Sequence, residues 1–180
     1  MNYGIYNTTE TASIIELFSR TFSDSEGPAE GQMIGELVNN LISQTPEQDI
    51  SVAVARDGSD VVGCILFTRL AFENENESEC FLMAPVAVRT DYQGKGVGQT
   101  LIEFGLTSMR DQGVKLAFTY GDPKFYSKTG FDQVTEQAFK APLPLSFPHG
   151  WMAQSLGEEK IEALAGLSVC VPEFNKPELW

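Results

Sequence analysis

Apolar residues recur along the chain at two different spacings, which predict helices and strands in alternation. Spacings of three and four residues indicate an amphipathic helix, whereas alternation or a short continuous apolar run indicates a strand. Helices are predicted from about residue 11, over 32–43 and from 97 to near 113, with a helical turn at 124–128. Strands are predicted over 2–6, 50–55, 61–70, 80–88, 114–120 and 131–134, with later candidates at 151–156 and 167–171.

Turn residues separate these elements. The pair Asp57-Gly58 between two β-rich runs is a strong hairpin signal. Residues 24–31, rich in acid, Gly and Pro, are predicted to be a loop, as are the polar residues 73–79. Three prolines prevent a regular element over 139–150. The chain contains no internal repeat and no linker, so the pattern predicts one mixed α/β domain over 1–180.

The charge of the chain excludes some classes of partner. Twelve Lys and Arg residues against 25 Asp and Glu residues give a net charge of −13. Nucleic acids and anionic membranes attract basic surfaces, so neither is an expected partner. The longest apolar run, 61–67, is far shorter than the ~20 residues that span a bilayer. The first residues also lack the cationic and apolar parts of a secretory signal.

The cysteines and the histidine favour a cytoplasmic protein without a metal. Cys64, Cys80 and Cys170 have neither the number of a disulfide framework nor the spacing of a zinc site. They are therefore predicted to be reduced residues. His149 is the only histidine and cannot build a multi-histidine metal site. Between Pro148 and Gly150 it is predicted to be a loop residue, although this loop could also border a substrate pocket.

A glycine-rich loop joins the buried strand 80–88 to the helix that begins at residue 97. It reads Gly94-Lys95-Gly96-Val97-Gly98. The first turn of a helix has unpaired amides, and glycines let a phosphate approach the main chain, so the loop is a candidate anion site. Arg89 and Lys95 supply the only positive charge nearby. The spacing excludes a dinucleotide fingerprint and a P-loop, and a tight turn without a ligand is the alternative for such a loop by itself.

Two motifs together carry a family resemblance. Gln93, Gly96 and Gly98 match Q/R-x-x-G-x-G/A after a strand, and residues 125–131 match F/Y-Y-x-x-x-G-F one helix and one strand later. The chain therefore resembles the GNAT superfamily of acyl-CoA-dependent N-acyltransferases over about half its length. The resemblance implies a mixed, mostly antiparallel sheet of about seven strands, with helices on both faces. It also implies that the strands 80–88 and 114–120 splay apart.

The resemblance assigns roles to particular residues. Main-chain amides of the loop would hold the cofactor's pyrophosphate, namely those of Gln93, Gly94, Lys95, Gly96, Val97, Gly98 and Gln99. Val86 and Val88, with side chains expected in the core, would pair through their main chain with the pantetheine arm. Tyr126 would protonate the departing thiolate of coenzyme A, since a phenol with a pKa near ~10 keeps its proton at neutral pH. The alternative for Tyr126 is an aromatic cluster that covers the sheet.

This sequence departs from the family at two places. Leu82 stands where some members have a catalytic carboxylate, and nearby Glu79 is out of register by three residues. The segment 121–123 is too short to supply the Asn that many members place before the tyrosine. The general base is therefore unassigned, and water is the default proton relay. Trp151 is expected to pack against the sheet.

The resulting prediction is an N-acetyltransferase that uses acetyl-CoA as co-substrate and needs no metal. A primary amine, in a small molecule or a peptide, would attack directly in a ternary complex. The acidic side chains at 24, 26 and 30 could attract a cationic amine. One alternative is a non-catalytic acyl-CoA sensor or docking module, and another is transfer of a larger acyl group such as propionyl or succinyl. A monomer or a homodimer is expected.

Overall fold

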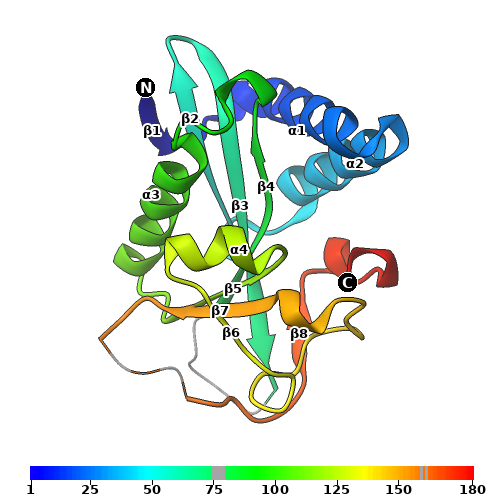
Figure 1. Cartoon of the computed structure of the whole chain (residues 1–180), viewed down its shortest axis with the longest axis vertical. Helices are drawn as coiled ribbons and strands as arrows, with labels where there is room; N and C mark the ends of the chain where they lie inside the picture. Colours follow the sequence, from blue (N-terminus) through cyan, green and yellow to red (C-terminus); the bar gives the residue numbers. More distant parts are fainter. Residues whose placement is uncertain (74–79, 159, 161) are drawn as a thin grey trace. The chain divides into compact units, whose positions relative to one another are not determined.

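The computed structural model describes residues 1–73, 80–158, 160 and 162–180 (Figure 1). The helices are α1 (Thr11–Glu26), α2 (Pro28–Gln44), α3 (Val97–Asp111) and α4 (Pro123–Tyr126). The strands are β1 (Asn2–Ile5), β2 (Ile50–Asp57), β3 (Asp60–Phe72), β4 (Cys80–Val88), β5 (Leu116–Tyr120), β6 (Asp132–Gln133), β7 (Trp151–Ser155) and β8 (Ser168–Cys170). Within the residues described, no helix has the length and apolar character needed to cross a membrane.

The strands form a mixed sheet, as predicted. Its order is β1-β2-β3-β4-β5-β7-β6, and β8 pairs with the end of β3. Most neighbours are antiparallel, and β4 and β5 are parallel. The sheet has eight strands where about seven were expected, because Leu70–Phe72 of β3 also pairs with the short strand β8. The α/β fold class is therefore confirmed.

The chain divides into two compact units. The first comprises Met1–Leu66 and Pro85–Gly105, and the second comprises Phe67–Ala84 and Leu106–Trp180. The strands β3 and β4 and the helix α3 each contribute residues to both units. The single domain over 1–180 stays a prediction.

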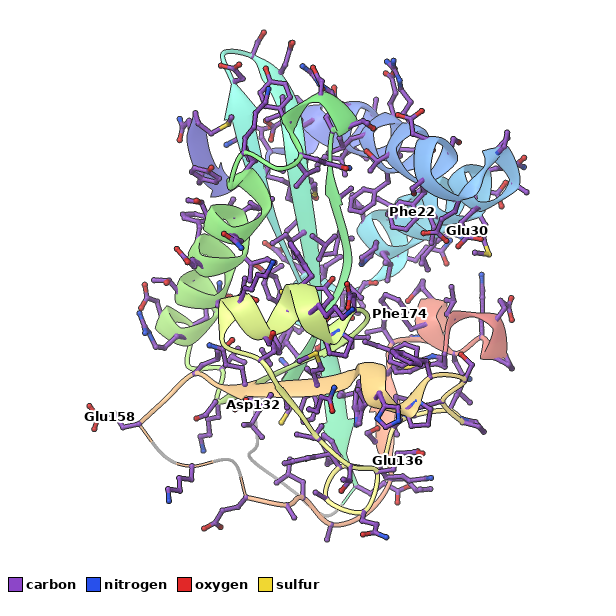
Figure 2. All side chains as sticks on the ribbon, in the orientation of Figure 1. Phe22, Glu30, Asp132, Glu136, Glu158 and Phe174 are labelled. Carbon is purple, nitrogen blue, oxygen red and sulfur yellow. The ribbon has the colours of Figure 1, made fainter. Side chains whose placement is uncertain are left out.

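The prediction of a loop over residues 24–31 was wrong. α1 continues to Glu26, and α2 already begins at Pro28, so the two helices meet at Gly27 (Figure 1). Gly27 has a φ of 102°, which residues with a side chain rarely adopt. This conformation lets the chain reverse within one residue. Pro28 suits the first position of a helix, because its fixed φ is helical and its missing N–H would be unpaired there. The acids of this segment, such as Glu30, lie on the helices (Figure 2).

The core of the second unit contains a group of aromatic side chains. Phe118 stacks on Trp151 at 5.2 Å between ring centroids and meets the edge of Phe139 at 5.2 Å. The indole N–H of Trp151 donates to the carbonyl oxygen of Phe139 at 2.9 Å, so its polar atom is satisfied. Trp151 is completely buried, which confirms that it packs within the protein. The three cysteines are free and buried.

An ion pair fastens the N-terminal segment of the first unit. Arg56 of β2 binds the carboxylate of Glu10 with its Nε and Nη2 atoms, the latter at 2.8 Å, and also donates to the carbonyl of Ile5 at 3.0 Å. The two charged side chains are only 19% and 17% exposed. The Arg56 hydrogen bond holds the pKa of Glu10 below its usual range. The pair therefore stabilises the folded state only while Glu10 is ionised.

We expect Glu10→Gln to lower the free energy of unfolding at pH 7 by about 1–2 kcal/mol, since a hydrogen bond between charged groups is lost. Because the folded-state pKa is lowered, the stabilisation is complete above the unfolded-state value and is lost as the pH falls through the folded-state value. The stabilities of wild type and variant, measured by urea unfolding, should therefore converge as the pH falls below the folded-state pKa of Glu10. Exposed Glu47→Gln is the control. Equal losses in both variants, or a loss that does not change with pH, would contradict this prediction.

Candidate functional site

The glycine-rich loop leaves β4 through a short 3-10 turn, Thr90–Tyr92, and ends where α3 begins at Val97. Gly94 and Gly96 have φ values of 70° and 82°, in the left-handed region that favours glycine. A Cβ atom at either position would meet no protein atom within 4 Å. The main chain is therefore open to a ligand at both glycines.

The loop and the first turn of α3 carry unpaired main-chain donors. Among the described residues, none accepts a hydrogen bond from the amides of Gly94, Lys95, Gly96, Val97, Gly98 and Gln99. The amide of Thr100 is the first to be paired, with the carbonyl of Gly96 at 3.0 Å. Unpaired amides at a helix N-terminus form a site that favours an anion. Binding of a pyrophosphate at this loop stays a prediction, and of the amides predicted for it, that of Gln93 is paired with the carbonyl of Thr90 at 3.3 Å.

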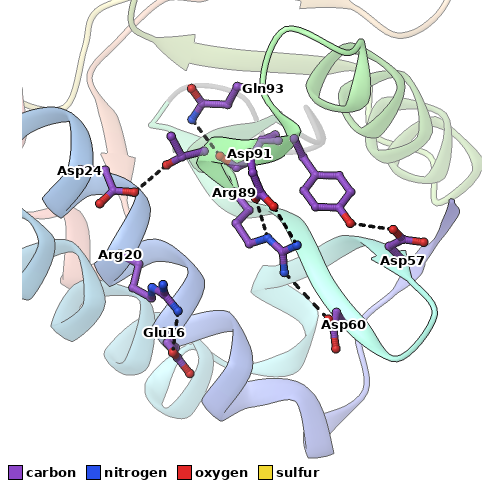
Figure 3. Close-up of polar contacts among 11 residues, drawn as sticks. Glu16, Arg20, Asp24, Asp57, Asp60, Arg89, Asp91 and Gln93 are labelled. Atoms are coloured by element: carbon purple, nitrogen blue, oxygen red, sulfur yellow. Dashed lines mark hydrogen bonds and ion pairs between the residues drawn. The ribbon is translucent and has the colours of Figure 1, made fainter.

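Side chains from elsewhere in the first unit hold the loop in place (Figure 3). The hydroxyl of Thr90 donates to Asp24 of α1 at 2.7 Å, and the hydroxyl of Tyr92 donates to Asp57 at the end of β2 at 2.6 Å. The side-chain amide of Gln93 donates to the carbonyl of Val88 at 2.9 Å. The sequence indicated no partner for Asp24 or Asp57, because these bonds join residues far apart in the chain.

Arg89 and Lys95, the two positive charges predicted near the loop, differ in their contacts with carboxylates. Arg89 binds the carboxylate of Asp91 with two nitrogens at 2.7 and 3.1 Å, and its Nη1 lies 3.9 Å from Asp60 (Figure 3). Arg89 holds the pKa of Asp91 below its usual range. The charge of the Arg89 guanidinium is thus balanced by carboxylates. Lys95 is exposed and forms no ion pair with another described residue.

The last part of β4 has one buried and one partly open face. Pro85 and Ala87 are buried, whereas Val86 and Val88 are half-buried. The expectation that the side chains of Val86 and Val88 face the core was therefore wrong. Side chains alternate between the two faces of a strand, and here Pro85 and Ala87 are on the buried face. The amide of Arg89, at the end of the strand, donates to the carbonyl of Val62 at 2.9 Å.

In the second unit, β4 and β5 pair over only a short stretch. Their parallel register runs from Cys80–Leu116 to Leu82–Phe118 and then ends. The next residue of β5, Thr119, donates its side-chain hydroxyl to the carbonyl of Met83 at 2.9 Å. This side-chain bond replaces the ladder where the strands begin to separate. The predicted splay agrees with this register.

Tyr126 lies at the end of α4, in the second unit, and its ring is half-buried. Asp122 caps this helix by accepting from the amide of Lys124 at 2.9 Å. A Cβ atom at Gly121 would lie 2.7 Å from the Tyr126 ring, so the absence of a side chain there makes room for the ring. The ring also meets the edge of Phe131 at 6.0 Å. The aromatic-cluster interpretation is therefore correct as a description of the packing.

The surroundings of Tyr126 favour its neutral form. Burial raises the pKa of the phenol, hydrogen bonding with Thr119 lowers it, and the charge of Asp122 raises it again, with a net increase. A phenol with a raised pKa keeps its proton at neutral pH and can donate it to a stronger base. Tyr126 is thus in the protonation state that a general acid requires.

Leu82 stands where some family members have a carboxylate. Leu82 is 1% exposed and packs in the core, whereas Glu79 lies outside the described residues. His149 is exposed in a 3-10 turn, with Phe147 at 6.0 Å between ring centroids, as expected for a loop residue. Among the described residues, no three His, Cys, Asp or Glu side chains are grouped as in a metal site.

A groove of about 620 Å³ lies in the first unit and was not expected from the sequence. It extends from α1 to the hairpin of β2 and β3 and to the turn before the loop. Its lining carries four carboxylates and two arginines among the residues Ser13, Glu16, Leu17, Arg20, Thr21, Asp24, Ser59, Asp60, Val61, Arg89, Thr90 and Asp91. Some of these charges cancel locally, as between Arg20 and Glu16 (Figure 3).

The mixed sheet and the open glycine loop define the class of this protein. The family model for the acetyltransferase (GNAT) domain matches residues 3–134, and the chain belongs to this family. It is 38% identical over 107 residues to YjhQ, an uncharacterized N-acetyltransferase of Escherichia coli K12. That match covers 57% of this chain and 59% of YjhQ, so it spans less than two thirds of the relative.

Solved structures share the fold. The crystal structure of YhbS from Escherichia coli, a GNAT family N-acetyltransferase in complex with CoA, superposes with a TM-score of 0.79 at 23% identity, covering 97% of this chain and 92% of YhbS. A GNAT family acetyltransferase from Brucella melitensis in complex with acetyl-CoA gives a TM-score of 0.74 at 20% identity, covering 97% of both chains.

Proposed function

We propose that this protein is an N-acetyltransferase that moves the acetyl group of acetyl-CoA to a primary amine. The observation that carries the proposal is the row of unpaired amides from Gly94 to Gln99, with two open glycines among them. Acetyl-CoA carries a pyrophosphate, which such a row of donors favours. The CoA and acetyl-CoA bound by the two structural neighbours support this choice of co-substrate.

The loop and β4 would bind different parts of the co-substrate. The unpaired amides of Gly94, Lys95, Gly96, Val97, Gly98 and Gln99 would face the pyrophosphate, whereas the amide of Gln93 donates to the carbonyl of Thr90 at 3.3 Å. Main-chain groups at Val86 and Val88 would pair with the pantetheine arm, as a neighbouring strand does. The end of the β4–β5 register at Leu82 and Phe118 supports this assignment, since this ladder does not extend to the main-chain groups of the two valines.

Tyr126 would act as the general acid. The amine nitrogen attacks the thioester carbonyl carbon, and the carbon–sulfur bond breaks as the amide bond forms. The electron pair leaves with sulfur, and the thiolate takes the proton of the Tyr126 hydroxyl. The attacking nitrogen loses one of its two hydrogens as a proton when it becomes an amide, and this proton restores the phenol through water. The amine must have lost a proton before the attack, because an ammonium has no lone pair. We assign that proton to water, since Leu82 has no titratable group.

Two alternative functions would use the same glycine loop to bind an acyl-CoA but would differ in whether, and which, acyl group is transferred. A non-catalytic acyl-CoA sensor would bind the same co-substrate without using Tyr126, and a transferase of propionyl or succinyl groups would need a deeper pocket. The acceptor is proposed to be a small molecule or a peptide with a primary amine. The buried, free cysteines support the expectation of a cytoplasmic protein.

Isothermal titration with acetyl-CoA tests the proposal first. We expect one site per chain, and the absence of binding at millimolar acetyl-CoA would remove the proposed function. Spectrophotometric detection of free CoA across a panel of amines then separates an enzyme from a sensor. Binding without amine-dependent release of CoA would support the sensor, and faster release from propionyl-CoA or succinyl-CoA would support a different acyl group.

A further inference from the structure

The contact between Asp57 and Tyr92 joins the hairpin of the first unit to the start of the glycine loop. Tyr92 immediately precedes Gln93, and its hydroxyl donates to Oδ2 of Asp57 at 2.6 Å across 35 residues of sequence (Figure 3). The distance is short for such a bond, as expected when the acceptor is ionised. Neither residue contributes an amide to the row of unpaired donors.

The ring of Tyr92 is in contact with cations from two points of the loop region. The guanidinium carbon of Arg89 lies 4.6 Å from the ring centroid, and the Nζ atom of Lys95 lies 5.4 Å from it. Arg89 precedes the 3-10 turn, and Lys95 lies between the two glycines with positive φ. A ring held at its hydroxyl by Asp57 therefore orders the chain before and after it.

Order in this loop matters because glycine loses more conformational freedom on ordering than any other residue. Gly94 and Gly96 have no side chain, and the position of a Cβ atom is open at both, so neither residue restrains its main chain by side-chain packing. A ligand that must order its own site binds more weakly, whereas a loop that is already ordered avoids that cost. The Tyr92 ring and its hydrogen bond supply a restraint that the glycines lack.

The negative charge of Asp57 shows whether this residue could act on a bound anion by electrostatic attraction or by positioning the loop. A carboxylate at Asp57 repels an anion bound at the nearby loop, so it cannot favour the anion through its charge. Any favourable effect of Asp57 on anion binding must act through the hydrogen bond to Tyr92. The pKa of Tyr92 is raised, first by this hydrogen bond, so the hydroxyl keeps the proton that it donates.

We propose that Asp57 and Tyr92 form a positioning pair that holds the glycine loop in its binding conformation for the pyrophosphate of acetyl-CoA. This inference rests on the proposed function. It assigns a role to an acidic residue of the β2–β3 hairpin, outside the loop motif. Neither residue is catalytic, since their action on the co-substrate passes through the loop.

The test compares acetyl-CoA affinity by isothermal titration in wild type, Tyr92→Phe, Asp57→Ala and the double variant. Each single variant should bind about five- to tenfold more weakly, and the double variant no more weakly than either single one. Asp57→Asn should bind at least as tightly as wild type, since the amide oxygen still accepts and the repelling charge is gone. Steady-state kinetics should show a raised KM for acetyl-CoA with little change in kcat.

Tyr6→Phe is the control, because it removes a tyrosine hydroxyl from the same unit at a residue whose amide pairs with Val52, near the opposite end of β2 from Asp57. The inference is overturned if Tyr92→Phe binds acetyl-CoA as tightly as wild type, or if Asp57→Asn binds as weakly as Asp57→Ala. It is also overturned if the two single losses add in the double variant. If wild type itself does not bind acetyl-CoA, the proposed function fails instead, so the two failures are distinguishable.

Discussion

We expect Gly96→Val to weaken acetyl-CoA binding by roughly 100-fold while the chain still folds. Gly96 has a φ of 82°, where a β-branched residue costs about 1–3 kcal/mol or moves the main chain out of the left-handed region. Movement of the main chain would displace the amides around Gly96. The new side chain would also occupy the open space that a phosphate needs, since no protein atom lies within 4 Å of a Cβ atom there.

A second glycine provides the matched control for this prediction. Gly113, just after the C-terminal end of α3, has a φ of 88° and is exposed, so it lies at the opposite end of this helix from the loop. Gly113→Val introduces a similar strain without filling the loop, so it should lower the melting temperature as Gly96→Val does but keep acetyl-CoA affinity within about threefold of wild type. Isothermal titration and thermal unfolding of both variants check this. Similar losses of affinity in both would show that strain alone, and not the loop, is responsible.

The second large effect is expected at Tyr126. Tyr126→Phe should lower kcat by roughly 100- to 10,000-fold, the usual range for loss of a general acid, and leave acetyl-CoA affinity nearly unchanged. The ring contacts with Phe131 and over Gly121 remain in the variant, so folding should be preserved. Only the proton donor is removed.

The pH dependence gives this prediction a second readout. Because burial first of all raises the pKa of Tyr126, the protonated acid persists above pH 10, and the wild-type rate should fall only at higher pH. That alkaline limb should be absent from the residual activity of Tyr126→Phe. Tyr3→Phe, in β1, serves as the control and should retain the wild-type profile. A variant Tyr126→Phe with unchanged kcat would leave the phenol with a packing role and would favour the aromatic cluster.

Local patterns predicted most of the elements, and their errors have a common physical cause. The segment 24–31 resembles a loop in composition, yet its acids lie on two helices that meet at Gly27. Composition averages over several residues, whereas a chain reversal needs only one glycine with positive φ followed by a proline at the helix start. The short strand β8 was predicted only as a candidate, since its register depends on β3, which lies far away in the sequence.

The candidate site shows the same division between local and long-range information. Arg89 carries a positive charge in any sequence-based interpretation, and only its contacts show that Asp91 and Asp60 neutralise it. Val86 and Val88 read as core residues because the whole strand is apolar, and only burial shows which face is open. Charge and exposure depend on neighbours, so residue types alone do not determine them.

The sequence by itself determined the order of helices and strands, the glycine loop at the start of a helix and the match to the GNAT family. Each of these depends on residues that lie close together in the chain, where spacing and backbone preference act directly. Only the tertiary structure decided which side chains anchor that loop. Asp24 reaches Thr90 across 66 residues and Asp57 reaches Tyr92 across 35, and such contacts form only when packing brings distant segments together.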